Sequence, residues 1–479
     1  MYRGLSVHTR IRCPAFVQGF LFLVETNLRE SIFSSPGGKG ENVTDEEYMR
    51  VALELAERGR GFVNPNPMVG AVIVKDGRII GQGWHRKYGE LHAERNALAD
   101  CTEEPAGATI YVTLEPCCHT GKTPPCTDAI LAAGIRRVVV GAMDPNPLVG
   151  GKGAAILREH GVSVETGVLK KECEEQNRVF LHYIRAGLPY VVLKYAMTLD
   201  GKIATATGAS QWITGEEARA QVHALRHELM GIMVGSGTVL ADDPMLNCRL
   251  PGAKNPVRII CDARLRTPLD AAVVRTAKEQ RTIIATVGNA AQETPQKTVG
   301  QQSEEMMRAQ GEANGKRERR LQAYRDKGCE ILELPVWDGH VDLRALMREL
   351  GRLGIDGILL EGGSSLNWSA LSLGIVNEVQ AYIAPKIFGG ATAKSPVEGS
   401  GIALPDDAFG LEDVKTEIIG GDFLVRGRVR QAAEKKIPAG EPQIAGKQEA
   451  SAKELQAARK QDASDEEPQT GGDICLPES

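Results

Sequence analysis

Three cysteines and one histidine fall within one short stretch of the chain, EPCCHTGKTPPC, at residues 115–126. A second histidine, His92, lies upstream in LHAERNA, two residues before Glu94. Thiolates and imidazoles are the ligands that zinc binds most often in proteins, usually in a tetrahedral shell. This group of soft ligands could therefore form a metal site, a disulfide or a reactive thiol.

The order of these residues favours a zinc site with one open position. His92, Cys117 and Cys126 supply one imidazole and two thiolates, which leaves the fourth position to water. A His-x-Glu element followed by Pro-Cys and a further cysteine is typical of zinc-dependent deaminases. In the first turn of a helix, Glu94 could reach that water and pass its proton to the leaving ammonia. We therefore predict His92, Cys117 and Cys126 as metal ligands and Glu94 as a catalytic residue.

The length of the cysteine loop leaves other interpretations open. Eight residues separate Cys117 from Cys126, whereas the common deaminase signature has two. Cys118 competes as a ligand, but in an extended segment its side chain should point away from that of Cys117, so we interpret it as a bystander. The alternatives are a loop disulfide or a closed zinc site completed by His119. Neither alternative gives the His-Ala-Glu element a role.

Alternating helix and strand patterns position these residues. Thr44 and Glu47 form a capping box ahead of an apolar helical stripe, and two strands surround the Asp76-Gly77 turn. Helix-like AERNALAD, strand-like ATIYVTLEP, helix-like CTDAILAAGI and strand-like RRVVVGAMD follow. This order predicts a sheet with helices on both faces. It also places His92 and Cys126 at helix starts, where the positive end of the dipole favours the thiolate of Cys126.

A second alternating region runs from about residue 188 to about residue 430, with strand-like GIMVGSG, VRIICD, RTIIATVG, GILLEGG and VQAYIAP. Residues 292–320 interrupt it as a polar insertion, for which we expect either a mobile segment or a solvated helix. No Gly-x-Gly-x-x-Gly follows the first strand, so a standard Rossmann domain is not indicated. The glycine pairs in ILLEGGSS and KIFGG could bring bare backbone to a cofactor phosphate, although such pairs are more often plain turns.

Composition sets the broad class. A chain of 479 residues is too long for one ordinary core, which predicts two folded domains. The apolar fraction is 42% and the net charge is −5, so neither a nucleic-acid partner nor a membrane surface is indicated. No apolar run is long enough to span a bilayer. The ten cysteines are scattered, unlike those of a small secreted disulfide framework, which favours the reducing cytoplasm.

The two ends of the chain lack a folded pattern. Arg3, Arg10 and Arg12 precede AFVQGFLFLV, which resembles a targeting peptide without a clear cleavage site. The plainer interpretation is an unstructured extension over residues 1–43 or an upstream start codon. From residue 431 to 479 large apolar residues are nearly missing, which predicts a disordered tail.

The motifs together resemble a known family. NPMVGAVIV, HAE, TLEPCCHTGKTPPC and DPNPLVGGKG resemble the deaminase half of the bifunctional riboflavin-biosynthesis deaminase/reductase. LKYAMTLDGKIATATGASQWITG, GSGTVLADDPMLNCR, LLEGGSSLN and APKIFGG resemble its reductase half. The resemblance covers about residues 44–430. It implies an α/β chain, with a cytidine-deaminase-like three-layer domain at 44–187 followed by a dihydrofolate-reductase-like α/β domain at 188–430.

The resemblance also implies the chemistry. The first domain would deaminate 2,5-diamino-6-(5-phosphoribosylamino)pyrimidin-4(3H)-one by zinc-dependent hydrolysis. The second would use NADPH to reduce the ribosyl group to a ribityl chain, giving 5-amino-6-(5-phosphoribitylamino)uracil. The implied cofactors are one Zn²⁺ per chain and NADPH. The implied partners are the phosphorylated pyrimidine and further copies of the chain, without nucleic acid or membrane.

Matching motifs carry site residues over to this chain. For the deaminase, the substrate contacts implied are Asn66, His85, His119 and Lys122. Taken alone, these are a turn Asn, surface His residues and a solvated Lys, although a Lys suits a phosphate ester. For the reductase, the substrate contacts implied are Ser210, Arg226, Leu246, Arg249 and Glu361. The NADPH contacts implied are Ala196, Trp212, Thr238, Asp242, Gly363, Ser364 and Ser365.

Two arginines and one lysine of the reductase half have a direct physical rationale. The guanidinium forks of Arg226 and Arg249 match phosphate oxygens. We predict that Lys194, with Asp200 nearby, flanks the hydride site as the catalytic residue; the plainer interpretation of the two is a salt-linked strand end. The resemblance also implies a small hydroxyl residue near the cofactor at position 263, where this chain departs with Ala263, in CDARL.

Two competing functions remain to be weighed. A zinc deaminase of another base or nucleoside, with an inactive reductase-like domain, would leave Lys122, the long loop and the reductase motifs unexplained. A nucleic-acid deaminase would also need a basic, aromatic-bearing surface, and aromatic residues are only 5%. A zinc-stapled binding protein without catalysis predicts no open water position and no effect of Glu94→Ala beyond stability.

Overall fold

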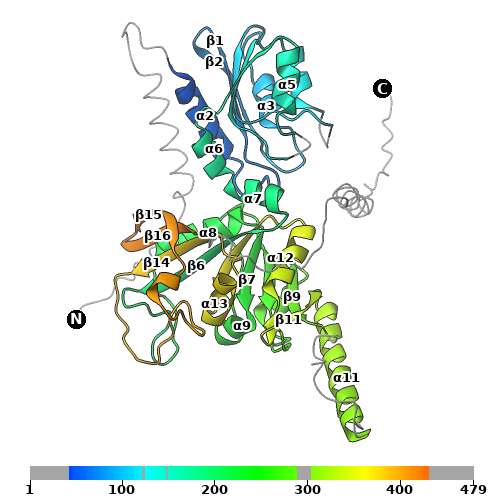
Figure 1. The fold of residues 1–479 in the computed structure, drawn as a ribbon, viewed down its shortest axis with the longest axis vertical. Coiled ribbons are helices and arrows are strands. Elements are labelled where there is room, and N and C mark those ends of the chain that lie inside the picture. The colour runs from blue at the N-terminus through cyan, green and yellow to red at the C-terminus, as the bar shows by residue number, and fades with distance from the viewer. Residues whose placement is uncertain (1–42, 121–123, 147–148, 289–303, 431–479) are drawn as a thin grey trace, which may run out of the picture. The chain divides into compact units, whose positions relative to one another are not determined.

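The computed structural model describes residues 43–120, 124–146, 149–288 and 304–430 (Figure 1). The expected N-terminal extension, apart from residue 43, and the expected tail lie outside these residues. Lys122 and residues 292–303 of the polar insertion lie outside them as well.

A five-stranded sheet forms the first half of the described chain, in the order β2-β1-β3-β4-β5. Strand β1 is antiparallel to both β2 and β3, whereas β3, β4 and β5 are parallel. Its strands are β1 (Gly70–Lys75), β2 (Arg78–Trp84), β3 (Thr109–Leu114), β4 (Arg137–Ala142) and β5 (Ser163–Thr166). The helices of this half are α2 (Asp45–Glu57), α3 (Ala93–Ala99), α4 (Cys126–Ala132), α5 (Lys152–Glu159), α6 (Lys170–Gln176) and α7 (Arg178–Ala186).

Helices cover both faces of this sheet, as the alternating pattern predicts. Figure 1 shows α2 and α6 on one face and α3 and α5 on the other. The predicted capping box is present, because Thr44 accepts from the amide of Glu47 and the Glu47 carboxylate accepts from Thr44. Strand β1 is buried almost throughout, as expected of a strand covered on both sides. The expected three-layer arrangement is therefore present.

Glycine in β2 allows α3 to lie directly on the sheet. A Cβ atom at Gly83 would lie 2.2 Å from the amide nitrogen of Ala97 and 2.5 Å from the carbonyl oxygen of Ala93. Only a residue without a side chain permits this approach. The close packing fixes the start of α3, and with it His92 and Glu94.

A nine-stranded sheet forms the second half, in the order β10-β9-β8-β7-β13-β6-β14-β16-β15. The pairs from β10 to β14 are parallel, and β16 and β15 add an antiparallel edge. Its strands are β6 (Tyr190–Thr198), β7 (Gly231–Gly235), β8 (Val257–Cys261), β9 (Thr282–Val287), β10 (Glu330–Leu334), β13 (Gly357–Gly362), β14 (Glu378–Ala384), β15 (Leu411–Ile419) and β16 (Asp422–Val429).

The connections of this sheet place loops at the carboxyl ends of its parallel strands. Strands β7 to β10 advance to one side of β13, and β6 and β14 lie on the other side. In open parallel sheets, ligands bind at the carboxyl ends where the strand order changes direction. The helices are α8 (Glu216–Glu228), α9 (Ser236–Asp242), α10 (Ala272–Arg275), α11 (Glu304–Asp326), α12 (Leu343–Arg352) and α13 (Ser364–Ser372). The smaller elements are the hairpin of β11 (Val336–Trp337) and β12 (His340–Val341) and a 3₁₀ turn at Pro405–Asp407.

Of the two expectations for the polar insertion, a mobile segment or a solvated helix, the part from Glu304 onward matches the helix. From Glu304 onward the segment is helical, and its described side chains up to residue 319 are mostly exposed. Leu321 and Tyr324 are fully buried and anchor the last turns to the core. Within the described ranges, no helix combines the length and the apolar character needed to cross a membrane.

Candidate functional site

The predicted metal ligands meet at one point. The Nδ1 atom of His92 lies 3.5 Å from the Sγ atom of Cys117 and 3.4 Å from that of Cys126. All three ligand atoms lie within 4.8 Å of one another. Tetrahedral zinc with ordinary Zn–S and Zn–N bonds separates a sulfur from a nitrogen ligand by about 3.6 Å. The geometry and the soft donor set therefore fit a zinc ion held by three protein ligands.

Helix α4 stabilises the thiolate of Cys117. The backbone amide of Cys126, at the start of α4, lies 3.4 Å from the Cys117 sulfur and donates to it. The start of α4 was predicted to favour the thiolate of Cys126 itself, whereas its amide donates to Cys117. A hydrogen bond from the Cys126 thiol lowers the pKa of Cys117 to about 4, and the same contact raises the pKa of Cys126. A cation bound between the two sulfurs would favour the thiolate form of both.

Glu94 lies beside the ligands and is almost completely buried, with 3% of its surface exposed. It sits in the first turn of α3, two residues after the N-cap residue His92. Burial, followed by the neighbouring Cys117, raises the pKa of its carboxyl group. A carboxyl group that can hold a proton next to an open metal position has the character of a proton shuttle.

Asn66 and His85 form a polar pair next to the metal ligands. The Nδ1 atom of His85 lies 3.1 Å from the carbonyl oxygen of Leu91, so this nitrogen carries the hydrogen and donates. The Nε2 atom then accepts from the side-chain amide of Asn66, 3.2 Å away. Burial lowers the pKa of His85, which keeps the ring neutral. Its ring centre lies 5.4 Å from that of His92.

The other residues of the cysteine loop are less enclosed. His119 is exposed, and the metal-binding group found among the described residues contains neither His119 nor Cys118. Those described residues thus form a site of three protein ligands, as predicted, and the closed site completed by His119 is not formed. Lys122 lies outside the described part of the chain.

Two residues that support the backbone around this site, Arg95 and Glu115, were not predicted from the sequence. Arg95 donates to the carbonyl oxygens of Pro124, at 3.3 Å, and Pro125, at 2.8 Å, which ties α3 to the segment ahead of Cys126. The buried Glu115 accepts from the backbone amides of Gly151 and Ala154. Their only sequence signal is adjacency, since Arg95 follows Glu94 and Glu115 precedes the Pro-Cys element.

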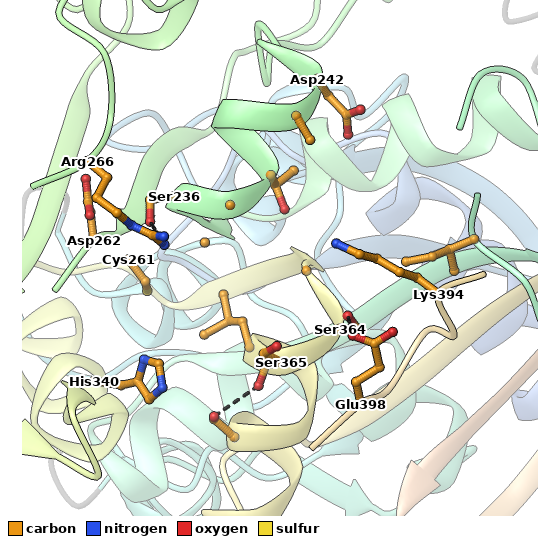
Figure 2. Close-up of a pocket in the computed structure, with 18 of the residues that line it drawn as sticks. Ser236, Asp242, Cys261, Asp262, Arg266, His340, Ser364, Ser365, Lys394 and Glu398 are labelled. Atoms are coloured by element: carbon orange, nitrogen blue, oxygen red, sulfur yellow. Dashed lines mark hydrogen bonds between the residues drawn. The ribbon is translucent and has the colours of Figure 1, made fainter. Parts of the chain in front are cut away.

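A second site is a cavity of about 640 Å³ at the carboxyl ends of β7, β8 and β13 (Figure 2). Six residues predicted to contact the cofactor or the substrate line it, namely Ser210, Thr238, Asp242, Gly363, Ser364 and Ser365. Two predicted cofactor contacts are not among its lining residues. Trp212 is 58% exposed beneath the guanidinium of Arg219, and Ala196 packs beside Tyr382.

The cavity suits a phosphate-bearing cofactor. Gly363 has φ +79°, and a Cβ atom there would lie 3.3 Å from the hydroxyl oxygen of Thr238. Glycine is thus required where the backbone turns from β13 into α13 and faces the cavity. Cationic side chains on the cavity wall include Arg264, Arg266 and Lys394. Bare amides, hydroxyls and cations are the groups that bind a dinucleotide.

Arg226, Glu361 and Lys194 form a partly buried charged cluster, in which Glu361 stands two residues before the cavity-lining Gly363. The Nε and Nη2 atoms of Arg226 lie 2.6 and 2.8 Å from the two carboxylate oxygens of Glu361. Its Nη1 atom donates to the carbonyl oxygen of Asn247 at 2.9 Å. Burial lowers the pKa of Lys194, and the Glu361 carboxylate opposes that shift.

The remaining predicted residues take different positions. Leu246 is buried with φ +49°, and Arg249 is exposed, with its amide donating to Nδ1 of His223 at 3.4 Å. Asp200 accepts from the amides of Phe388, at 3.1 Å, and Gly389, at 2.7 Å. It therefore anchors the KIFGG loop and makes no salt link to Lys194. Ala263 lines the cavity, so the hydroxyl expected at this position is missing from the cavity wall.

Two of the chain's segments match family models. Residues 42–142 match the cytidine and deoxycytidylate deaminase zinc-binding region, and residues 189–425 match the RibD C-terminal domain. Riboflavin biosynthesis protein RibD of Actinobacillus pleuropneumoniae is 51% identical over 393 residues, which is 82% of this chain and 97% of that protein. The chain belongs to the bifunctional riboflavin-biosynthesis deaminase/reductase family. RibD of Aquifex aeolicus is 40% identical, over 80% of this chain and 97% of that protein.

Solved structures of deaminase/reductase family members agree. RibD of Acinetobacter baumannii is 34% identical, with a TM-score of 0.67 over 81% of this chain and 99% of that one. The enzyme from Thermotoga maritima, described as a diaminohydroxyphosphoribosylaminopyrimidine deaminase and 5-amino-6-(5-phosphoribosylamino)uracil reductase, is 37% identical, with a TM-score of 0.66 over 81% and 99%. The predicted family, the cytidine-deaminase-like and dihydrofolate-reductase-like folds, the two activities and the cofactors zinc and NADPH are confirmed. The lone deaminase and the non-catalytic zinc protein are not favoured.

Proposed function

We propose that the two sites act in succession on one phosphorylated pyrimidine. The first hydrolyses the amine of 2,5-diamino-6-(5-phosphoribosylamino)pyrimidin-4(3H)-one, and the second reduces the ribosyl group of its product to a ribityl chain. The observation that carries this proposal is the buried Glu94 beside a three-ligand metal site, in the same chain as a cavity lined by Gly363, Ser364 and Ser365.

In the deaminase site, His92, Cys117 and Cys126 hold zinc, which when bound activates a water molecule as the nucleophile. Glu94 takes a proton from that water and delivers it to the departing amine, so water enters and ammonia leaves. Its raised pKa suits both halves of this transfer. Asn66, His85, His119 and Lys122 contact the substrate, with the neutral His85 and Asn66 as a hydrogen-bonding pair and Lys122 as the partner of its phosphate.

In the reductase site, Lys194 is the catalytic residue and the proton donor at the sugar. NADPH supplies the hydride when bound. The carboxylate of Glu361 orients Lys194 and meets the substrate, and Arg226 holds Glu361. Arg249 is exposed and free to bind the substrate phosphate, while Ser210 and Leu246 complete the substrate contacts. Thr238, Asp242, Gly363, Ser364 and Ser365 hold the cofactor, together with Ala196 and Trp212.

The organisation of the chain belongs to the same proposal. We place the deaminase domain at residues 44–187 and the reductase domain at residues 188–430. The enzyme assembles as a homo-oligomer, for which the open edge strand β15 offers exposed apolar residues at Val414 and Ile418. It works in the reducing cytoplasm, consistent with eight described cysteines that are all free.

A paired assay of the purified enzyme tests the proposal. Ammonia release and NADPH oxidation are followed together on the diaminopyrimidine ribosyl phosphate, with Glu94→Gln and Lys194→Met as single variants. Glu94→Gln should lose ammonia release but keep NADPH oxidation on pre-deaminated substrate. Lys194→Met should keep ammonia release but lose NADPH oxidation. Neither activity in folded, zinc-loaded wild-type protein would overturn the proposal.

A further inference from the structure

The loop after β8, residues 262–267, forms one wall of the cofactor cavity and is held from inside. The Oδ2 atom of Asp262 accepts from the amide of Thr267 at 2.7 Å and from its hydroxyl at 2.8 Å. Both side chains are completely buried. These two hydrogen bonds hold the ends of the loop together, so residues 263–266 project outward from it.

Helix α11 holds the same loop from outside. The Nε atom of Arg320 donates to the carbonyl oxygen of Leu265 at 3.0 Å, and its Nη2 atom donates to that of Thr267 at 2.8 Å. The hydroxyl of Tyr324, one turn further along α11, also donates to Thr267. The planar guanidinium of Arg320 therefore binds the carbonyl oxygens on either side of Arg266, a two-donor geometry that no other side chain can reproduce.

The double restraint aims Arg266 at the cavity. Its Nη2 atom lies 3.1 Å from the hydroxyl oxygen of Ser236, which is buried at the start of α9. Figure 2 shows Arg266 and Ser236 together on one side of the cavity, with Lys394 and Glu398 on the opposite side. A guanidinium next to a hydroxyl offers several donors to one phosphate group.

The strand order places this pair far from the reacting atoms. Lys194 lies on β6, the glycine turn of Gly363 follows β13, and Arg266 follows β8. Three strand spacings separate β8 from β6, which is about 14 Å. A dinucleotide with its nicotinamide near Lys194 and its pyrophosphate at Gly363 would bring its adenosine to Arg266. NADPH differs from NADH by one phosphate on that adenosine ribose.

We infer that Arg266, positioned by Arg320 of helix α11, binds the adenosine ribose phosphate and is the residue by which this enzyme selects NADPH over NADH. The inference rests on the proposed role of the cavity as the cofactor site. Lys394 lies across the cavity from Ser236 and is not placed to share this task. Arg264 is the nearer rival, but no hydrogen bond ties it to a cavity hydroxyl among the contacts of the described residues.

Equilibrium binding to the zinc-loaded full-length chain tests the inference without turnover. Titration calorimetry compares NADP⁺ with NAD⁺, and 2′,5′-ADP with 5′-AMP. Wild-type protein should prefer the phosphorylated member of each pair. Arg266→Ala should weaken NADP⁺ and 2′,5′-ADP roughly 10- to 100-fold, the loss expected for charged hydrogen bonds, and leave NAD⁺ and 5′-AMP unchanged.

Variants of α11 test the positioning role. Arg320→Met should shift selectivity in the same direction by a smaller factor, whereas Arg319→Ala, at an exposed neighbour on the same helix, should not. Unchanged binding of 5′-AMP by each variant reports that the cofactor cavity is folded. Equal losses for NADP⁺ and NAD⁺, no change in Arg266→Ala, or loss of selectivity in Arg264→Ala alone would overturn the inference. Failure of wild-type protein to bind either dinucleotide would instead refute the cofactor cavity itself.

Discussion

Arg226 and Glu361 face each other as a two-pronged ion pair, although 135 residues separate them in the chain. Helix α8 carries the guanidinium and β13 the carboxylate, and a third donor of Arg226 binds the carbonyl oxygen of Asn247. Three of its five N–H groups are thus committed inside the protein. These contacts support the proposal that Arg226 positions Glu361 and that the exposed Arg249 binds the substrate phosphate.

The two arginines should give different kinetic defects. Arg226→Leu leaves the buried Glu361 without its partner, a change that typically costs several kcal/mol, so kcat of the reductase should fall about 100-fold or more. Arg249→Ala should raise KM for the phosphorylated substrate about 10-fold with kcat near the wild-type value. Steady-state NADPH oxidation on pre-deaminated substrate measures both, and equilibrium binding of NADP⁺ serves as the folding control for the reductase domain. A defect confined to KM in Arg226→Leu would contradict this division of roles.

The adjacent cysteines provide a matched test of the metal site. Cys117→Ser and Cys126→Ser should each lose bound zinc and ammonia release, because a hydroxyl is a far poorer zinc ligand than a thiolate. Cys118→Ser should keep both, since Cys118 lies outside the ligand group. Metal analysis of the purified variants, with reductase activity as the control, checks this. Zinc loss in Cys118→Ser equal to that in Cys117→Ser would refute the ligand assignment.

Arg258 should be a large contributor to the stability of the reductase half. It is completely buried on β8, and its partners are the hydroxyls of Thr276 and Thr282 and the carbonyls of Met245, Thr276 and Gln280. Arg258→Met leaves these buried acceptors unpaired and should lower the free energy of unfolding by about 3 kcal/mol or more. The exposed pair of Arg281 with Glu330 is the control, and Arg281→Met should change stability by less than about 1 kcal/mol. Urea unfolding followed by tryptophan fluorescence compares the two.

His223 should make stability depend on pH in mildly acidic solution. Burial, followed by the nearby Arg226 and Arg249, lowers its pKa from 6.5 to about 4. Between these values the unfolded chain binds a proton that the folded chain does not, so this residue makes stability fall as pH falls from 6.5 towards 4. His223→Asn keeps an acceptor for the Arg249 amide but cannot titrate. Its free energy of unfolding should therefore fall less steeply than that of wild-type protein between pH 6.5 and 5, and parallel slopes would exclude the effect.

Much of the deaminase site could be predicted because its determinants are local. Zinc chemistry restricts the ligands to histidine and cysteine, and His92 and Cys126 stand at helix starts that the apolar pattern predicts. Successive side chains of an extended segment point to opposite sides, which was enough to predict that Cys118 is not a zinc ligand. The sequence could not show that the α4 amide serves Cys117, since that depends on how the long loop returns.

The reductase site depended on the tertiary structure. Motifs located Arg226, Glu361 and Asp200, but their partners lie on other elements, so a free phosphate ligand and a salt-linked strand end were as consistent with the sequence as the contacts found. Residue types and their short-range spacing by themselves indicated the zinc ligands and a deaminase, and the resemblance of the motifs added the family and the reductase chemistry. The order of parallel strands and the packing of α11 decided which charges pair and that Arg266 faces the cavity, because such long-range contacts form only when distant elements pack together.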